Sequence, residues 1–180
     1  NRYAFNYLHC RLVMATIQLN ETQEKFRKKM LNPIFFRLFT MTKVPAGAIA
    51  GMKLTYLDTS QCQTTLPFKF LNKNPFKSIY FAVQSMAAEL STASLALLAI
   101  TGKNPSVAFI IVDLEAKFMK KATGKVTFTC ENGEEAFKAV EECIETGESK
   151  VVKMKTVGRL KDGTEVSEFY FSWSFKQRKQ

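Results

Sequence analysis

The spacing of apolar residues changes along the chain, from a helical period in the first fifty residues to a mainly two-residue period afterwards. Residues 2–19 place apolar side chains three or four positions apart, which indicates a weakly patterned helix. Asn20 and Gln23 have the spacing of a capping box and predict the start of a second helix. Pro33 fits the first turn of a third, strongly apolar helix. We therefore expect an N-terminal helical arm over residues 1–45.

Strict alternation of apolar and polar residues predicts strands in much of the remaining chain. Residues 52–70 have the pattern of a hairpin, in which Phe68 and Phe70 continue the face of the second strand. The Asp162-Gly163 pair predicts a tight hairpin turn. A short amphipathic helix is expected after Asn132-Gly133. Further strands are predicted over residues 107–114, 126–130, 150–160 and 169–175.

One long apolar helix is predicted between the strands. Ser78 can cap a helix that runs from residue 79 to about Thr101, and 16 of the 22 residues from 79 to 100 are apolar. Such a helix is either buried or spans a membrane. Its six polar residues and its flanking strands favour burial. The resulting prediction is an α+β domain over residues 46–180, with an antiparallel sheet of about six strands wrapped around a long central helix.

Composition and charge narrow the classes of function. The chain is 46% hydrophobic, and its 16 Phe and 1 Trp predict a phenylalanine-rich core. The net charge is +10, and residues 1–48 hold eight basic and two acidic residues. This favours anionic partners such as an acidic membrane surface or a phosphorylated small molecule, or simply forms a solvated surface. Nucleic acid is not expected, because neither a base-reading helix nor an RNA-binding strand pattern is recognisable.

The cysteines and the single histidine argue against metal and nucleophile chemistry. Cys10, Cys62, Cys130 and Cys143 include no C-x-x-C pair, and His9 lies in the arm. We therefore expect no metal site and no Cys-His or Ser-His machinery. Scattered cysteines on apolar faces indicate reduced core residues and a cytoplasmic protein. No signal peptide is recognisable, and we do not take Asn1 as the natural start of the protein.

The run Asn74-Pro75-Phe76-Lys77-Ser78-Ile79-Tyr80-Phe81-Ala82, followed by Glu89, resembles the hotdog-fold superfamily of acyl-thioester enzymes. The similarity is greatest to the DUF4442 family, in which this run and an Ala-Ala-Glu-Leu helix segment recur. Lys120-Lys121-Ala122, Phe128-Thr129-Cys130 and Trp173-Ser174-Phe175 also look like this family. The resemblance covers roughly residues 20–178. It implies a hotdog fold, a homodimer or dimer of dimers, and a substrate carried by coenzyme A or an acyl carrier protein.

Small hotdog thioesterases carry an Asn-x-x-Gly-Thr-x-His-Gly-Gly motif and an acid seven residues after the second of these adjacent glycines. Without a gap, the motif places Asn74 on the asparagine, Ser78 on the threonine and Glu89 on the acid. Tyr80 stands at the histidine, and Phe81-Ala82 stand at the two glycines. The spacing matches, whereas the histidine and both glycines are replaced. Backbone N–H groups approach a thioester less easily without glycine.

The resemblance gives each of these residues an expected role. Glu89 is the expected general base, because desolvation raises a carboxyl pKa toward neutrality; the alternative is a structural acid paired with a lysine. Asn74 orients the water or the carbonyl, or else caps the loop before Pro75. The Phe81 N–H polarises the carbonyl. Because Glu89 lies about 12 Å along the helix from Phe81, we expect a second subunit to complete the site.

Substrate contacts are expected around these residues. Ser78, Ala82 and Ser85 would contact the substrate from the same segment. Four basic residues are candidates to bind the phosphates of coenzyme A. The alternative is that their side chains are solvated at the ends of strands. The basic set is Lys117, Lys120, Lys121 and Arg159.

Three functions remain open from the sequence. The first is hydrolysis of an acyl thioester, with no metal and with no cofactor apart from coenzyme A as part of the substrate. The second is non-catalytic binding of acyl groups or fatty acids in a phenylalanine-rich tunnel. The third is weak contact of the basic arm with a membrane surface, through the cationic segment 25–30.

Overall fold

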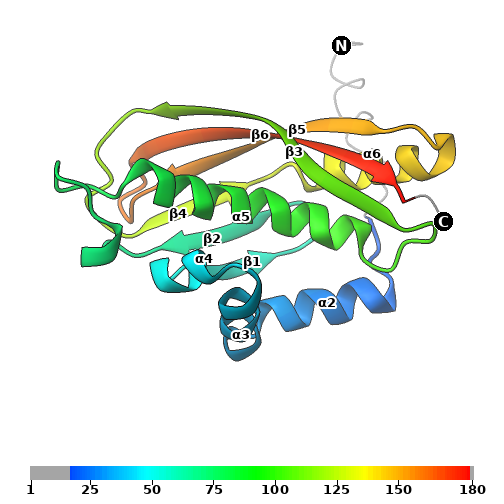
Figure 1. Cartoon of the computed structure of the whole chain (residues 1–180), viewed down its shortest axis with the longest axis horizontal. Helices are drawn as coiled ribbons and strands as arrows, with labels where there is room; N and C mark the ends of the chain where they lie inside the picture. Colours follow the sequence, from blue (N-terminus) through cyan, green and yellow to red (C-terminus); the bar gives the residue numbers. More distant parts are fainter. Residues whose placement is uncertain (1–16, 179–180) are drawn as a thin grey trace, which may run out of the picture.

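A single antiparallel sheet of six strands forms the frame of the protein (Figure 1). The computed structural model describes residues 17–178. The strands lie in the order β1-β2-β4-β5-β6-β3, so β1 and β3 are the two edge strands. Each predicted strand region contains a strand, but the alternation predicted over residues 52–56 fails, because a bulge between Leu54 and Tyr56 exposes Tyr56 and buries Leu57. The strands are β1 (Lys53–Leu57), β2 (Cys62–Leu66), β3 (Val107–Phe118), β4 (Val126–Cys130), β5 (Lys150–Arg159) and β6 (Glu165–Gln177).

The central helix α5 (Phe81–Ile100) packs against the sheet, which confirms the predicted architecture (Figure 1). It is long and apolar enough to cross a membrane, but 61% of its most apolar window is buried inside the protein. Polar side chains also fasten it to the sheet. The Ser91 hydroxyl donates to Thr156 Oγ1 over 2.8 Å, and the Trp173 indole donates to Thr92 Oγ1 over 3.0 Å. Thus most of the polar residues of α5 serve packing.

The core is rich in phenylalanine, as the composition predicts. Alternate residues of β6 point toward α5, and β4 adds Phe128 to the same layer. Phe169 and Phe171 stack at a centroid distance of 6.2 Å. Helix α6 (Gly133–Thr146), the predicted amphipathic helix, contacts α5, β5 and β6. The fully buried aromatic side chains are Phe128, Phe169, Phe171 and Phe175.

The helical arm packs on the β1 side of the sheet, at the edge opposite β3. It contains α2 (Glu21–Leu31), α3 (Pro33–Lys43) and α4 (Pro45–Ala50), which contact β1 and α5. The capping box of Asn20 and Gln23 is confirmed. Helix α4 was not predicted from the segment after Lys43: Val44 interrupts the helical path, and Pro45 starts a new first turn. The helix predicted over 2–19 lies outside the described residues except for 17–19, which are not helical.

Two predicted boundaries are wrong, for local reasons. Strand β2 ends at Leu66, because Pro67 has no N–H to continue the ladder, and Phe70 instead begins the short 3₁₀ helix η1 (Phe70–Asn72). Phe68 likewise lies beyond the strand. Ser78 does not cap α5, which begins only at Phe81 after Tyr80. The Tyr80 N–H donates to Asn72 O, which keeps the chain extended up to that point.

Candidate functional site

Several of the predicted site residues come together at one end of the molecule, where α5 begins (left in Figure 1). The Ile79 N–H donates to Ala122 O over 2.9 Å, so the loop that carries Lys120 and Lys121 lies against the segment before α5. The ring of Phe81 meets that of Phe118, at the end of β3, with centroids 6.2 Å apart. The loop before α5, the start of α5 and the connection from β3 to β4 therefore form one neighbourhood.

Asn74 organises the loop that leads into α5. Its Oδ1 accepts hydrogen bonds from the N–H of Phe76 (3.0 Å) and from the N–H and hydroxyl of Ser78 (both 3.2 Å). Its own N–H donates to Ser78 O over 2.9 Å. Lys77 within this loop has a φ of 59°, a left-handed conformation that favours glycine. Asn74 thus acts as a loop cap here, and its Nδ2 forms no hydrogen bond to the described residues.

The start of α5 presents backbone donors. Val83 and Gln84 donate their N–H groups to Tyr80 O, each over 3.1 Å. Within residues 17–178, the N–H groups of Phe81 and Ala82 have no acceptor. Free N–H groups and the positive end of the helix dipole favour an oxygen that gains negative charge. The geometry therefore offers the polarising donor expected at Phe81.

Two polar side chains of α5 differ from the rest of the helix. Gln84, Ser91, Thr92 and Ser94 all form side-chain hydrogen bonds. Among the described residues, the side chains of Ser85 and Glu89 form none. They lie one helical turn apart and are both half-buried, on the side of α5 that the sheet does not cover. The half-buried stripe on this side is Ala82, Ser85, Met86, Glu89, Ala93, Leu97 and Ile100.

Glu89 is desolvated without being neutralised. Burial raises its pKa above the usual carboxyl value, and no other cause contributes. In the described part of the chain, no lysine or arginine lies within ion-pair distance of Glu89. A structural carboxylate in such surroundings normally has a cationic partner, because burying an unpaired charge is costly. Among the described residues, Glu89 is therefore not part of an ion pair, and its raised pKa makes it a candidate for proton transfer.

The four basic residues predicted for phosphate binding differ in their surroundings. Lys117 Nζ lies 3.5 Å from Glu168, and Arg159 lies 2.6 Å from Glu165. Exposed Lys120 and Lys121 form no ion pair with a described residue. The expectation of phosphate binding therefore narrows to Lys120 and Lys121, and their role stays a prediction.

Lys117 belongs to an ion-pair network on β3, β5 and β6. Lys155 donates to Glu168 over 2.5 Å and is the main cause that lowers the pKa of this carboxyl to about 2. The ammonium groups of Lys117, Lys153 and Lys155 lie 5.2–5.6 Å from the centroid of the Tyr170 ring. Because acids already share these charges, this network is a weaker anion site than a free lysine pair.

The three cysteines within residues 17–178 do not supply a nucleophile. Burial raises the pKa of Cys130 to about 12 and shifts that of Cys62 strongly in the same direction, so neither forms a thiolate at neutral pH. Cys143 is also buried and free. Residues 17–178 contain no cluster of side chains suited to a metal ion. His9 and Cys10 lie outside the described residues.

Two features near the site were missed from the sequence. Phe118 joins Tyr80 and Phe81 in an aromatic cluster, although nothing in the sequence pattern distinguishes it from other strand residues. Gln84 ties the start of α5 to the sheet: it accepts from the Ser167 hydroxyl over 2.8 Å and donates to Ile79 O. The sequence signal that could have identified Gln84 was a lone glutamine in an apolar helix.

Two hollows of about 490 and 440 Å³ border the arm, and neither includes a residue of α5.

An antiparallel sheet wrapped around one long central helix defines the hotdog-fold class of proteins. Residues 33–174 match the family described as "Domain of unknown function (DUF4442)", and the chain belongs to this family. No match is found among curated proteins.

Solved structures share this fold at low sequence identity. A probable thioesterase from Pseudomonas aeruginosa is 18% identical with a TM-score of 0.68, over 81% of this chain and 97% of its own. A protein of unknown function from Chlorobaculum tepidum is 13% identical with a TM-score of 0.70, over 87% and 98%. A thioesterase from Haemophilus influenzae is 12% identical with a TM-score of 0.57, over 78% and 88%. These similarities establish the hotdog fold.

Proposed function

We propose that this protein hydrolyses an acyl thioester of coenzyme A or of an acyl carrier protein, with Glu89 as the general base. The observation that carries the proposal is a half-buried carboxylate with a raised pKa and no counter-ion among the described residues. The names of the structural neighbours from Pseudomonas aeruginosa and Haemophilus influenzae support a thioesterase. We place this reaction in the cytoplasm, in keeping with the free cysteines.

The proposed reaction is a direct attack by water. Glu89 takes a proton as the water oxygen bonds to the thioester carbonyl carbon. The carbonyl oxygen gains charge and accepts a hydrogen bond from the Phe81 N–H. The C–S bond then breaks, and the thiolate leaves and takes up a proton. The Asn74 amide and Tyr80 would orient the reacting groups, while Ser78, Ala82 and Ser85 would contact the substrate.

A second subunit is part of the proposal. Eight residues separate Phe81 from Glu89, which is about 12 Å along the helix, so one chain does not bring both to the same carbonyl. Strand β3 is an open edge, and its side chains Ile110, Val112 and Leu114 are exposed. A second copy that pairs along β3 would cover the half-buried stripe of α5. The acyl chain would then lie between subunits, with Lys120 and Lys121 near the coenzyme A phosphates.

A non-catalytic acyl-binding protein is the second candidate. It is favoured by Tyr80 at the position of the thioesterase histidine. The side-chain oxygen of Asn74 is also already used within its own loop. Such a protein would hold an acyl group in the same place and would not release a thiol.

The decisive experiment measures thiol release from acyl-coenzyme A and acyl-carrier-protein substrates of several chain lengths. We expect Glu89→Gln to lower kcat by about a hundredfold or more. Glu145→Gln, an exposed substitution on α6, is the matched control and should keep full activity. Unchanged activity in a folded Glu89→Gln variant rejects Glu89 as the base. A bound acyl group in native mass spectrometry without turnover favours the binding protein.

A further inference from the structure

Helix α3 exposes a row of large apolar side chains on its outward face. Phe36 and Thr40 are buried toward the protein. On the outside, Ile34 is 74% exposed, Leu38 59% and Met41 56%. A surface helix normally turns its polar side to water, whereas α3 turns large apolar side chains to water. Large apolar side chains in such a row mark a surface that contacts something other than water.

Exposed apolar side chains continue onto α4, which is next to α3, and onto η1, which is next to α4. Helix α4 contacts both α3 and η1, and Lys69 Nζ donates to Ile49 O over 2.6 Å. Ile49 is 63% exposed, and Phe70 and Leu71 of η1 are 83% and 65% exposed. Exposed apolar side chains are therefore present on α3, α4 and η1.

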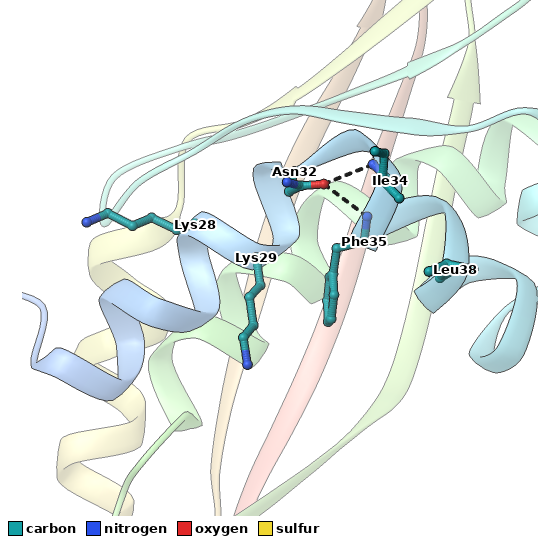
Figure 2. Close-up of a pocket in the computed structure, with 6 residues that line it drawn as sticks. All are labelled: Lys28, Lys29, Asn32, Ile34, Phe35 and Leu38. Carbon is teal, nitrogen blue, oxygen red and sulfur yellow. Dashed lines mark hydrogen bonds between the residues drawn. The ribbon is translucent and has the colours of Figure 1, made fainter.

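Cations accompany this apolar surface. A hollow of about 490 Å³ between α2 and α3 is lined by Lys28 and Lys29 together with apolar residues of α3 (Figure 2). Figure 2 shows the side chains of Lys29 and Phe35 next to each other, extending in the same direction. Among the described residues, Lys29 and Arg37 have no acidic partner. We call the following set the basic apolar face: Lys29, Ile34, Phe35, Arg37, Leu38 and Met41.

The part of the sequence that contains the basic apolar face is also positively charged. Residues 25–57 contain seven basic residues and no acidic residue. Glu21 and Glu24 precede this stretch and already pair with Lys25, Arg27 and Lys28. The apolar side chains therefore lie in a positive field, which attracts an anionic surface.

We propose that the basic apolar face docks on an anionic lipid membrane. Its apolar side chains would enter the boundary between headgroups and acyl chains, while Lys29 and Arg37 would contact the anionic headgroups. A lipid surface suits exposed apolar side chains that stand next to cations without acidic partners among the described residues. This inference goes beyond the proposed function and does not depend on it.

A second copy of the chain fits this face poorly. A two-fold contact would place the same cations opposite each other, and like charges in an interface oppose association. The open edge β3, which the proposed dimer uses, lies at the other side of the sheet. Pairing along β3 therefore leaves the basic apolar face free for a membrane.

Vesicle flotation of the full chain tests this proposal. The vesicles contain phosphatidylcholine alone or with phosphatidylserine, at low and at high salt. We expect binding to the anionic vesicles that weakens with salt. The Leu38→Ser/Met41→Ser variant should lose at least about tenfold in partitioning. The Lys29→Gln/Arg37→Gln variant should lose about fivefold for each cation removed.

Matched controls separate this face from general effects. Val151→Ser and Lys161→Gln change exposed residues on and beyond β5, and both should bind like the unmodified chain. No flotation of the unmodified chain, or equal binding to neutral vesicles, overturns the proposal. So does an oligomer in gel filtration that Leu38→Ser/Met41→Ser abolishes, because a second copy then occupies the face. Circular dichroism verifies that each variant is folded.

Discussion

At the scale of single residues, the raised pKa of Glu89, which the proposed reaction uses, also affects the stability of the fold. Its pKa is raised in the folded protein by burial alone. A carboxyl whose pKa is raised on folding contributes stability below its unfolded pKa and loses that contribution as the pH rises through the folded pKa. The ionised Glu89 is therefore a cost that the folded protein carries at neutral pH.

Replacing Glu89 by glutamine should remove this cost. We expect Glu89→Gln to have the higher free energy of unfolding at neutral pH, because glutamine remains uncharged there. The advantage should shrink as the pH falls toward about 4, where the unfolded carboxyl is protonated. Urea unfolding at a series of pH values and one protein concentration measures it. A Glu89→Gln variant that is less stable than the unmodified protein at neutral pH contradicts the prediction, and Glu145→Gln is the control.

Lys77 shows how the loop before α5 holds a strained residue. A left-handed φ of 59° costs a residue with a Cβ about 1–2 kcal/mol in the folded protein. Glycine avoids this cost, but part of the gain is offset because glycine makes the unfolded chain more flexible. We expect Lys77→Gly to raise the free energy of unfolding by up to about 1 kcal/mol. Lys73→Gly, at an extended position of the same loop, should lower it. Equal destabilisation by both, measured by urea unfolding, would count against strain at Lys77.

At the scale of elements, α5 is held by hydrogen bonds that face the sheet. Trp173 on β6 donates its indole N–H to Thr92, and the pair is buried. We expect Thr92→Val, which keeps the side-chain shape, to cost about 1–3 kcal/mol because the indole N–H loses its acceptor. Thr42→Val is the control, since Thr42 is exposed and bonds only within α3. A Thr92→Val effect no larger than that of the control, in guanidinium unfolding, would contradict this role.

At the scale of the whole molecule, the two edges of the sheet have different surroundings. The helical arm packs along β1, whereas β3 is open and carries exposed apolar residues. Natural proteins usually protect such an edge with charges or with a partner strand. The proposed dimer would satisfy β3 and would place two copies of Glu89 near a shared seam.

Charges on β3 should therefore separate the subunits. We expect Ile110→Lys/Leu114→Lys to convert a dimer into a monomer in light scattering, because like charges would face each other across paired strands. Hydrolysis should fall together with the dimer. Val151→Lys on β5 adds an exposed charge elsewhere and should leave the dimer intact. A monomeric unmodified protein, or an unaffected dimer in the doubly substituted variant, argues against the β3 seam.

Much of the fold could be predicted because its signals are local. The capping box at Asn20, the turn at Asp162-Gly163 and the alternation in β6 depend on neighbouring residues, and all three are confirmed. The failures also have local causes. Pro67 ends β2 early, and the bond from the Tyr80 N–H to Asn72 O delays α5. In both cases a single proline or a single hydrogen bond, rather than the spacing of apolar residues, determines where the element begins or ends.

The candidate site was predictable only where its residues are close together in the chain. Asn74, Tyr80 and Phe81 lie within eight residues, so a spacing pattern could bring them together. The contact of Ile79 with Ala122 and that of Phe81 with Phe118 join segments about forty residues apart. The pairing of Lys117 with Glu168 likewise depends on the register between β3 and β6.

The sequence by itself determined a six-stranded sheet around one buried helix, because hydrophobic periods and turn residues act over a few neighbours. Only the tertiary structure decided which polar residues of that helix stay free. Both Ser85 and Ser91 are serines, yet the Ser91 hydroxyl bonds to Thr156, whereas the Ser85 hydroxyl forms no hydrogen bond with a described residue. This difference arises because only one side of α5 faces the sheet, and the way in which the helix packs determines which side chains lie there. The same orientation leaves Glu89 without an ion-pair partner among residues 17–178.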